Sequence, residues 1–322
     1  MEKSTKSKIL PCLLVLFLLC SILISGCTRK KTAPTDEKIL YSVTDATGFK
    51  LNFTAKPQRI VSLSISTDEI LLDLVPTARI VALTKYVDDA GISNVVERAQ
   101  EVKGRVRDTN PESILAMQPD LVILPDFTSR DTIQSLREMQ LAVYVYATPY
   151  DLPGIRTCIK ELGRAVGEET NAQALLARMD EKLASVKAKL GSIPLEKQKR
   201  VVFMSEKGAY YSPRHSFNDI CAHAQVRNAL AELNFTKPVT VAQEEIVRLN
   251  PDAFVLSGWI DKDEQEPAAV AHNLRHDASF SSVKAVQDNA IYTLPAKHLL
   301  SLSQYVVEAS ADLAAAVYGT QL

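Results

Sequence analysis

The 322-residue sequence is poor in cysteine, glycine and aromatic residues, and its basic and acidic residues nearly balance. Five cysteines in a chain of this length are too few for a disulfide scaffold. The formal net charge of −1 lacks the basic excess that nucleic-acid binding requires. With 46% hydrophobic and 23% charged residues, the chain is too apolar for disorder and too charged for a polytopic membrane protein. These totals indicate a globular protein of two domains, or of one large domain.

Sequence motifs of catalysis are also missing. The sequence contains no Gly-rich phosphate loop, no nucleophile elbow and no metal-hydrolase motif. Direct capture of a metal ion would need three or four converging His and carboxylate groups. All five histidines lie after residue 214, so the two halves of the chain cannot share a histidine site. We therefore predict a protein without enzymatic activity, resident metal or cofactor.

The N-terminus has the parts of an export signal. Lys3, Lys6 and Lys8 precede an uncharged stretch over residues 9–28. Within it, the segment Leu-Ile-Ser-Gly-Cys ending at Cys27 resembles a bacterial lipoprotein cleavage site, where the cysteine is lipid-modified and becomes the new N-terminus. A retained membrane-spanning anchor is the alternative, because about 20 uncharged residues can just cross a bilayer.

We predict a signal peptide over residues 1–26, lipidation at Cys27 and a polar tether over residues 27–39. The body of the protein would then lie outside the cytoplasm, anchored to the cell membrane by lipid. After cleavage two cysteines remain in the body, Cys158 and Cys221, which we interpret as buried free thiols.

Two segments far apart in the chain follow the same pattern. Residues 243–258 align without gaps to residues 111–126, with Glu, Ile, Pro, Asp and Leu at matching places 132 residues apart. Each predicts a helix with an acidic first turn, a proline that ends it, and a buried strand. The run at residues 200–205 likewise matches that at 59–64, where a strand precedes a capped helix start. Convergence on a common helix-to-strand junction could explain one pair, but two pairs in the same order favour two similar αβ lobes.

The two other organising features are a hairpin and a long helix. Residues 41–53 alternate around an Ala-Thr-Gly turn and predict an opening β-hairpin. Residues 170–190 have leucine, methionine and valine at helical spacing between charged residues. A helix of about 20 residues spans about 30 Å. It could cover the surface of one lobe or form a strut between two.

Taken in order, these segments resemble the solute-binding lipoproteins of ABC importers for iron-siderophores, haem and vitamin B12, the helical-backbone class of periplasmic binding proteins. The resemblance covers about residues 40–320, and its matching stretches are 43–48, 57–70, 112–123, 246–252 and 286–292. One departure is Ala224-Gln225, which stands where relatives commonly have a Gly-Gly turn before Asn228.

The resemblance implies an α/β fold with two Rossmann-like lobes joined by a single long α-helix. The corresponding lobes are residues 40–155 and 193–322, and residues 156–192 form the connecting helical region. It implies capture of a ferric siderophore in the cleft between the lobes, with a corrinoid or haem as alternatives. The partners implied are the permease and ATPase of an ABC importer, with no role for nucleic acid.

The resemblance also implies that one exposed glutamate on each lobe pairs with arginines of the permease. By motif position these are Glu69 and Glu244, although Glu245 adjoins the second. Exposed carboxylates set far apart would fix the docking orientation. The alternative is that each is an ordinary acid in the first turn of a helix.

Ligand contacts are expected on loops that follow predicted strands. Aromatic rings there would form a wall for a large planar or macrocyclic ligand, and Arg214 would suit an anionic chelate. For haem, Tyr86 or His298 could supply the axial ligand. The alternative for each residue is surface exposure or packing within a lobe. The candidates are Ser64, Ile65, Tyr86, Asp126, Phe127, Tyr210, Tyr211, Arg214, Trp259 and Lys297.

Overall fold

The computed structural model describes residues 38–258 and 267–319. The predicted signal peptide, the lipidation site Cys27 and the candidate ligand residue Trp259 lie outside the described residues. The described residues from Leu40 onward form one compact unit. Within the described ranges, every helix is too short or too polar to cross a membrane.

The N-terminal lobe opens with the predicted hairpin. Strands β1 (Tyr41–Thr44) and β2 (Lys50–Phe53) pair antiparallel. Gly48 takes a φ of 82° in the turn, a conformation that glycine adopts without steric cost. The buried Asp45 accepts hydrogen bonds from the backbone N–H groups of Thr47 and Phe49 and pairs with Arg137 at 2.6 Å. The hairpin prediction is confirmed.

A parallel five-stranded sheet forms the centre of this lobe, in the order β5-β4-β3-β6-β7. Its three inner strands are almost wholly apolar because helices cover both faces. The strands are β3 (Ile60–Ser62), β4 (Ile80–Thr84), β5 (Gly104–Val106), β6 (Leu121–Pro125) and β7 (Val143–Tyr146). The helices are α2 (Ile65–Leu74), η1 (Thr77–Arg79), η2 (Lys85–Asp88), α3 (Val96–Ala99), α4 (Pro111–Ala116), α5 (Arg130–Glu138) and α6 (Leu152–Ala165).

The C-terminal lobe has a parallel four-stranded sheet in the order β10-β8-β12-β13 and a separate antiparallel pair, β9 with β11. The strands are β8 (Arg200–Phe203), β9 (Ala209–Tyr211), β10 (Arg227–Asn228), β11 (Val239–Val241), β12 (Ala253–Ser257) and β13 (Ile291–Leu294). The helices are η3 (Leu195–Lys197), α8 (Ser216–His223), η4 (Ala229–Leu233), α9 (Gln243–Leu249), α10 (Pro267–His276), η5 (Ala278–Phe280), α11 (Lys284–Gln287), α12 (Ala296–Leu299) and α13 (Val306–Tyr318).

The internal repeat has a physical basis in the structure. Strands β6 and β12 begin and end at positions 132 residues apart, as the alignment predicts. In each lobe the aspartate before the strand binds the start of the neighbouring strand. Asp120 accepts a hydrogen bond from the backbone N–H of Arg59 at 2.8 Å, and Asp252 accepts one from Arg200 at 2.9 Å. The shared Pro-Asp junction therefore fixes the position of the two central strands of each sheet relative to one another.

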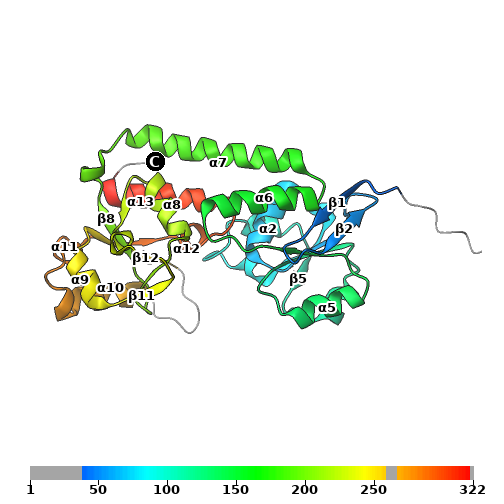
Figure 1. Ribbon diagram of the computed structural model, residues 1–322, viewed down its shortest axis with the longest axis horizontal. Coiled ribbons are helices and arrows are strands. Elements are labelled where there is room, and N and C mark those ends of the chain that lie inside the picture. Colours follow the sequence, from blue (N-terminus) through cyan, green and yellow to red (C-terminus); the bar gives the residue numbers. More distant parts are fainter. Residues whose placement is uncertain (1–37, 259–266, 320–322) are drawn as a thin grey trace, which may run out of the picture. The chain divides into compact units, whose positions relative to one another are not determined.

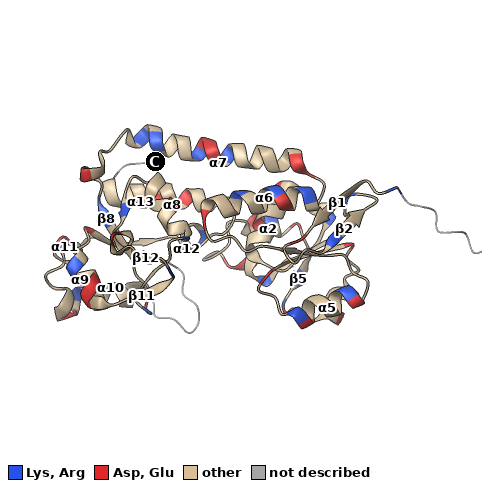
Figure 2. Ribbon diagram, viewed as in Figure 1, with Lys and Arg blue, Asp and Glu red and all other residues tan. Residues whose placement is uncertain are grey.

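The predicted long helix is α7 (Glu169–Leu190). It packs against α2 and α6 of the N-terminal lobe and against α8 and α13 of the C-terminal lobe (Figure 1). Its first turn holds an acidic residue and its last turn Lys187 and Lys189, which suits the helix dipole (Figure 2). The two-lobed α/β fold with one long helix is confirmed, while the lobe boundaries at residues 155 and 192 stay predictions.

The two cysteines of the body are free and buried, as predicted. Cys158 lies on α6 and Cys221 on α8. Burial raises the pKa of the Cys158 thiol to about 12 and raises that of Cys221 as well. Both thiols therefore pack as small apolar groups.

Candidate functional site

A cavity of about 720 Å³ brings together residues of both lobes. Tyr150 reaches it from the segment that follows β7, and Tyr210 reaches it from β9. Both rings are about half exposed, so their apolar faces are open to a ligand. The lining residues are Tyr150, Tyr210, Ser212, Pro213, Arg214, His215, Thr236 and Pro238.

Arg214 is the charged residue of this lining, and it is paired. Its Nε lies 3.0 Å from Oδ2 of Asp151, which caps the N-terminus of α6 by accepting the N–H of Gly154 at 2.9 Å. Burial alone would raise the pKa of Asp151, but the hydrogen bonds from Arg214 and Gly154 lower it below the ordinary value. Asp151 is therefore charged at neutral pH and offsets the guanidinium.

His215 contributes a neutral ring. Its Nδ1 accepts the backbone N–H of Phe217 at 3.1 Å and so caps α8, which places the remaining ring proton on Nε2. Burial lowers the pKa of His215. The ring meets Tyr210 edge to face, with centroids 6.3 Å apart. In this tautomer His215 can donate one hydrogen bond but cannot coordinate a metal through Nε2.

The predicted aromatic residues of the N-terminal lobe lie apart from this cavity lining. Tyr86 in η2 and Phe127 after β6 follow the carboxyl ends of their strands and are exposed, Phe127 by 76%. The ammonium of Lys85 lies 5.4 Å from the centre of the Tyr86 ring. Asp126 accepts a hydrogen bond from the Thr148 hydroxyl at 2.7 Å. These side chains are available at the sheet edge, and their role in ligand binding stays a prediction.

Ser64 and Ile65 serve the start of α2. The Ser64 hydroxyl oxygen accepts the N–H of Thr67 at 3.2 Å as the helix N-cap. It also accepts the phenol of Tyr146 at 2.8 Å. Ile65 is the first residue of the helix and packs against the core. The Ser64 hydroxyl is thus already engaged within the lobe.

Tyr211, another expected ligand residue, does not line this cavity but a separate one of about 550 Å³ within the C-terminal lobe, and its role in ligand binding stays a prediction. Successive side chains of a strand point to opposite faces. In β9 the neighbour Tyr210 faces the cavity, whereas Tyr211 is 8% exposed and belongs to the core of the C-terminal lobe. Lys297, in the first turn of α12, is half-buried, and its carbonyl accepts the Asn94 side-chain amide at 2.7 Å.

Glu69 is a correction to the expected docking pair, because the expected exposed carboxylate is 2% exposed. Its Oε1 accepts the backbone N–H and the side-chain amide of Asn94, each at 2.9 Å, and its Oε2 accepts the Ser303 hydroxyl. Burial raises the pKa of Glu69, while these hydrogen bonds oppose the rise. The segment that precedes α13 covers this part of α2, so Glu69 cannot present a charge to a partner.

Glu244 lies in the first turn of α9 and is exposed, as expected. Among the described residues its side chain has no ion-pair partner, whereas the neighbouring Glu245 pairs with Arg248. The repeat places Glu112 at the position equivalent to Glu244, 132 residues earlier, in the first turn of α4. Glu112 is also exposed. The matched exposed pair is therefore Glu112 and Glu244.

The turn at Ala224-Gln225 forms without glycine. Gln225 adopts a φ of 53°, in the left-handed region. Its side chain accepts the N–H of Ile193 at 2.8 Å and donates to the carbonyl of Gly191 at 2.7 Å. These bonds hold the segment after α7 against the turn.

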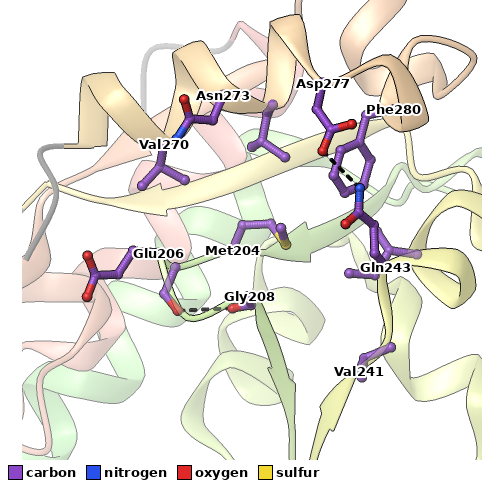
Figure 3. Close-up of a pocket in the computed structure, with 12 residues that line it drawn as sticks. Met204, Glu206, Gly208, Val241, Gln243, Val270, Asn273, Asp277 and Phe280 are labelled. Carbon is purple, nitrogen blue, oxygen red and sulfur yellow. Dashed lines mark hydrogen bonds between the residues drawn. The ribbon is translucent and has the colours of Figure 1, made fainter.

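A smaller cavity of about 220 Å³ lies within the C-terminal lobe (Figure 3). Apolar side chains such as Met204, Val270 and Phe280 line it together with polar groups. The Gln243 amide donates to the Asp277 carboxylate at 3.0 Å across one end. Lined from one lobe alone, it is a less suitable place for a ligand held between lobes.

Sequence reasoning missed Tyr150, Asp151 and His215. Tyr150 follows strand β7 and could have been found by the same loop rule as Phe127. His215 adjoins Arg214, and Asp151 begins a helix, so neither pattern pointed to a cleft. Across the described residues, no cluster of three or more His, Cys, Asp or Glu side chains is placed to hold a metal ion. His298 bonds through Nδ1 to Asp312 at 2.6 Å and is mostly buried.

Known proteins resemble this chain over most of its length. The cobalamin-binding protein of Halobacterium salinarum is 23% identical over 90% of this chain and 78% of its own. The ferric enterobactin-binding periplasmic protein FepB of Escherichia coli is 24% identical over 68% of this chain and 67% of its own.

Solved structures share the fold. A periplasmic binding protein from Veillonella parvula aligns with a TM-score of 0.72 and 18% identity, over 88% of this chain and 98% of its own. The haem-binding protein RhuT from Roseiflexus aligns with a TM-score of 0.66 and 21% identity, over 81% and 98%. The periplasmic binding protein family model matches residues 60–298, which is well over half of the sequence. The chain therefore belongs to the periplasmic binding protein family, whose members bind solutes and are not enzymes.

Proposed function

We propose that the protein captures a ferric siderophore in the cavity between its lobes and delivers it to the permease of an ABC importer. The observation that carries this proposal is the cavity lined by Tyr150 from one lobe and Tyr210 from the other. Its volume of about 720 Å³ falls in the range of small-molecule sites, roughly 300–1,000 Å³. Aromatic faces suit the organic shell of a metal chelate. The name of one relative, the ferric enterobactin-binding protein FepB, supports this class of ligand.

A corrinoid is the second candidate. The cobalamin-binding protein of Halobacterium salinarum aligns with 90% of this chain, a larger share than FepB does. A corrinoid would use the same aromatic cavity. Haem is a further alternative, since haem-binding proteins share the fold. Among the residues that line the cavity, its axial ligand would be a tyrosine, because Nδ1 of His215 caps α8 and the ring proton lies on Nε2.

Delivery requires a surface that the permease recognises. We assign this role to Glu112 and Glu244, the matched exposed acids of α4 and α9. Two carboxylates on separate lobes would orient the docked protein more than they would add affinity. Lipidation at Cys27 would keep the protein at the outer face of the membrane near the permease.

The test is calorimetric titration of the mature chain with ferrichrome, ferric enterobactin, cyanocobalamin and haemin. We expect at least one to bind below micromolar and to be recovered chemically unchanged, as mass spectrometry would reveal. Failure of all four to bind would overturn the proposed ligand class. A ligand returned in altered form would contradict the role of a binding protein.

A further inference from the structure

Among the described residues, the charges around the inter-lobe cavity are balanced. Of the eight lining residues, Arg214 carries a formal charge and His215 can titrate. Lys237 lies between two lining residues but does not itself line the cavity, and its side chain is exposed, where water screens its charge. The net charge that a ligand meets therefore depends on what Arg214 and His215 have beside them.

Asp151 supplies a fixed negative charge next to Arg214. The ion pair spans 3.0 Å, and the Arg214 side chain is mostly exposed, so the guanidinium could turn toward a ligand. Asp151 could not follow, because its other oxygen caps α6 through Gly154 and its side chain is 18% exposed. The carboxylate would remain beside the cavity and offset the cation whether or not the pair is formed.

His215 adds no charge at neutral pH. Protonation would place a hydrogen on Nδ1, which now accepts the N–H of Phe217, so it would break the cap of α8. Burial also disfavours the charged ring and lowers the pKa of His215. What His215 offers is the Nε2–H donor, beside the open ring of Tyr210. As far as the described residues line it, the cavity thus offers hydrogen-bond donors and aromatic faces without a net positive charge.

We infer that this cavity selects a ligand of low net charge, a neutral ferric hydroxamate chelate or a neutral macrocycle such as a corrinoid, and that Asp151 is the residue that sets this preference. The inference rests on the proposed function and narrows it. A trianionic catecholate chelate would lose hydration in the cleft without an uncompensated cation to replace it. This reverses the expectation from sequence that Arg214 favours an anionic chelate.

The experiment compares affinities for neutral ferrichrome and cyanocobalamin with that for trianionic ferric enterobactin, in the wild type and in Asp151→Asn. Asparagine caps helices as well as aspartate does, so α6 should keep its start. We expect the wild type to bind one of the neutral ligands more tightly than ferric enterobactin. In Asp151→Asn the preference should shift toward the anion by about tenfold, and the shift should shrink as salt is added.

Asp180→Asn is the matched control. Asp180 on α7 pairs with Arg156 on α6 at 2.7 Å, as Asp151 pairs with Arg214, but it does not line the cavity. It should leave the ratio of affinities unchanged. Because the readout is a ratio measured on one sample, a partly unfolded variant does not distort it. Tighter binding of ferric enterobactin by the wild type, or an unchanged ratio in Asp151→Asn, would overturn this inference and leave capture of a chelate intact. If neither these three ligands nor haemin binds, the proposed function itself fails.

Discussion

The carboxylate of Glu69 accepts a hydrogen bond from the hydroxyl of Ser303, although 234 residues separate them in the chain. Gln304 donates to the carbonyl of Glu69 and to the carboxylate of Asp73, and Asn94 joins Glu69 to the carbonyl of Lys297. The segment between α12 and α13 is thereby tied to α2 of the N-terminal lobe. Glu69 connects parts of the protein rather than facing a partner.

Removal of this carboxylate should destabilise the protein. Glu69→Ala would leave the N–H of Asn94 and the hydroxyl of Ser303 buried without an acceptor, and we expect the free energy of unfolding to fall by about 3 kcal/mol. Glu69→Gln keeps an acceptor for Asn94 and should cost about 1 kcal/mol. Urea denaturation measures both.

Glu244→Ala is the control for this pair, because an exposed acid without a partner among the described residues should change stability by less than about 0.5 kcal/mol. A Glu69→Ala variant as stable as Glu244→Ala would show that the buried network contributes nothing.

The neighbouring Asp68 should make stability depend on pH. It is fully buried, with Oδ2 accepting from the N–H and hydroxyl of Thr84, and burial raises its pKa to about 7 from an ordinary 3.8. The unfolded state therefore ionises first as pH rises, so the free energy of unfolding falls between about pH 4 and pH 7 and levels off above. At about 1.4 kcal/mol per pH unit, the loss approaches 4 kcal/mol.

Asp68→Asn removes this ionisation. We expect the variant to gain stability relative to the wild type as the pH is raised from 4 to 8, measured by denaturation at each pH. Asp88→Asn is the contrast, because the hydrogen bond from Arg105 lowers the pKa of Asp88 from its ordinary 3.8. Asp88 is therefore ionised in the folded and unfolded states above about pH 4, and the stability difference between Asp88→Asn and wild type should stay nearly constant across this range. A constant difference between Asp68→Asn and wild type across this range would contradict the raised pKa.

The repeated helix-to-strand junction was predictable because proline, aspartate and the apolar run act locally, and the strands β6 and β12 follow that pattern in each lobe. The burial of Glu69 was not predictable, because the segment that covers it lies more than 200 residues away in the sequence. The same holds for Tyr210 and Tyr211. The alternation of side chains along a strand predicts that the two rings point to opposite faces of β9. Which face meets the cavity and which meets the core depends on tertiary packing, which the sequence pattern does not give.

Docking can be separated from ligand binding. The double variant Glu112→Ala with Glu244→Ala should abolish uptake of the bound ligand through the permease and leave its dissociation constant within about twofold, because neither acid lines the inter-lobe cavity. Transport into vesicles that carry the importer, together with titration of the isolated protein, measures the two effects.

Asp131→Ala is the matched control for docking. Asp131 is an exposed first-turn acid of α5 in the N-terminal lobe, and it lies outside the aligned stretch of residues 111–126. It should transport normally. Equal loss with Asp131→Ala would reveal a general charge effect, and weakened ligand binding in the double variant would refute the docking role.

The adjacent tyrosines of β9 should separate binding from folding. Tyr210→Ala removes an open ring of the cavity and should weaken ligand binding by about tenfold or more, with stability nearly unchanged. Tyr211→Ala removes a ring from the core and should lower the free energy of unfolding by about 3 kcal/mol. Titration and urea denaturation of both variants make the comparison. The opposite outcome would be weakened ligand binding in Tyr211→Ala and lost stability in Tyr210→Ala. It would mean that β9 presents its other face to the ligand, because a shift of register by one residue exchanges the two faces of a strand.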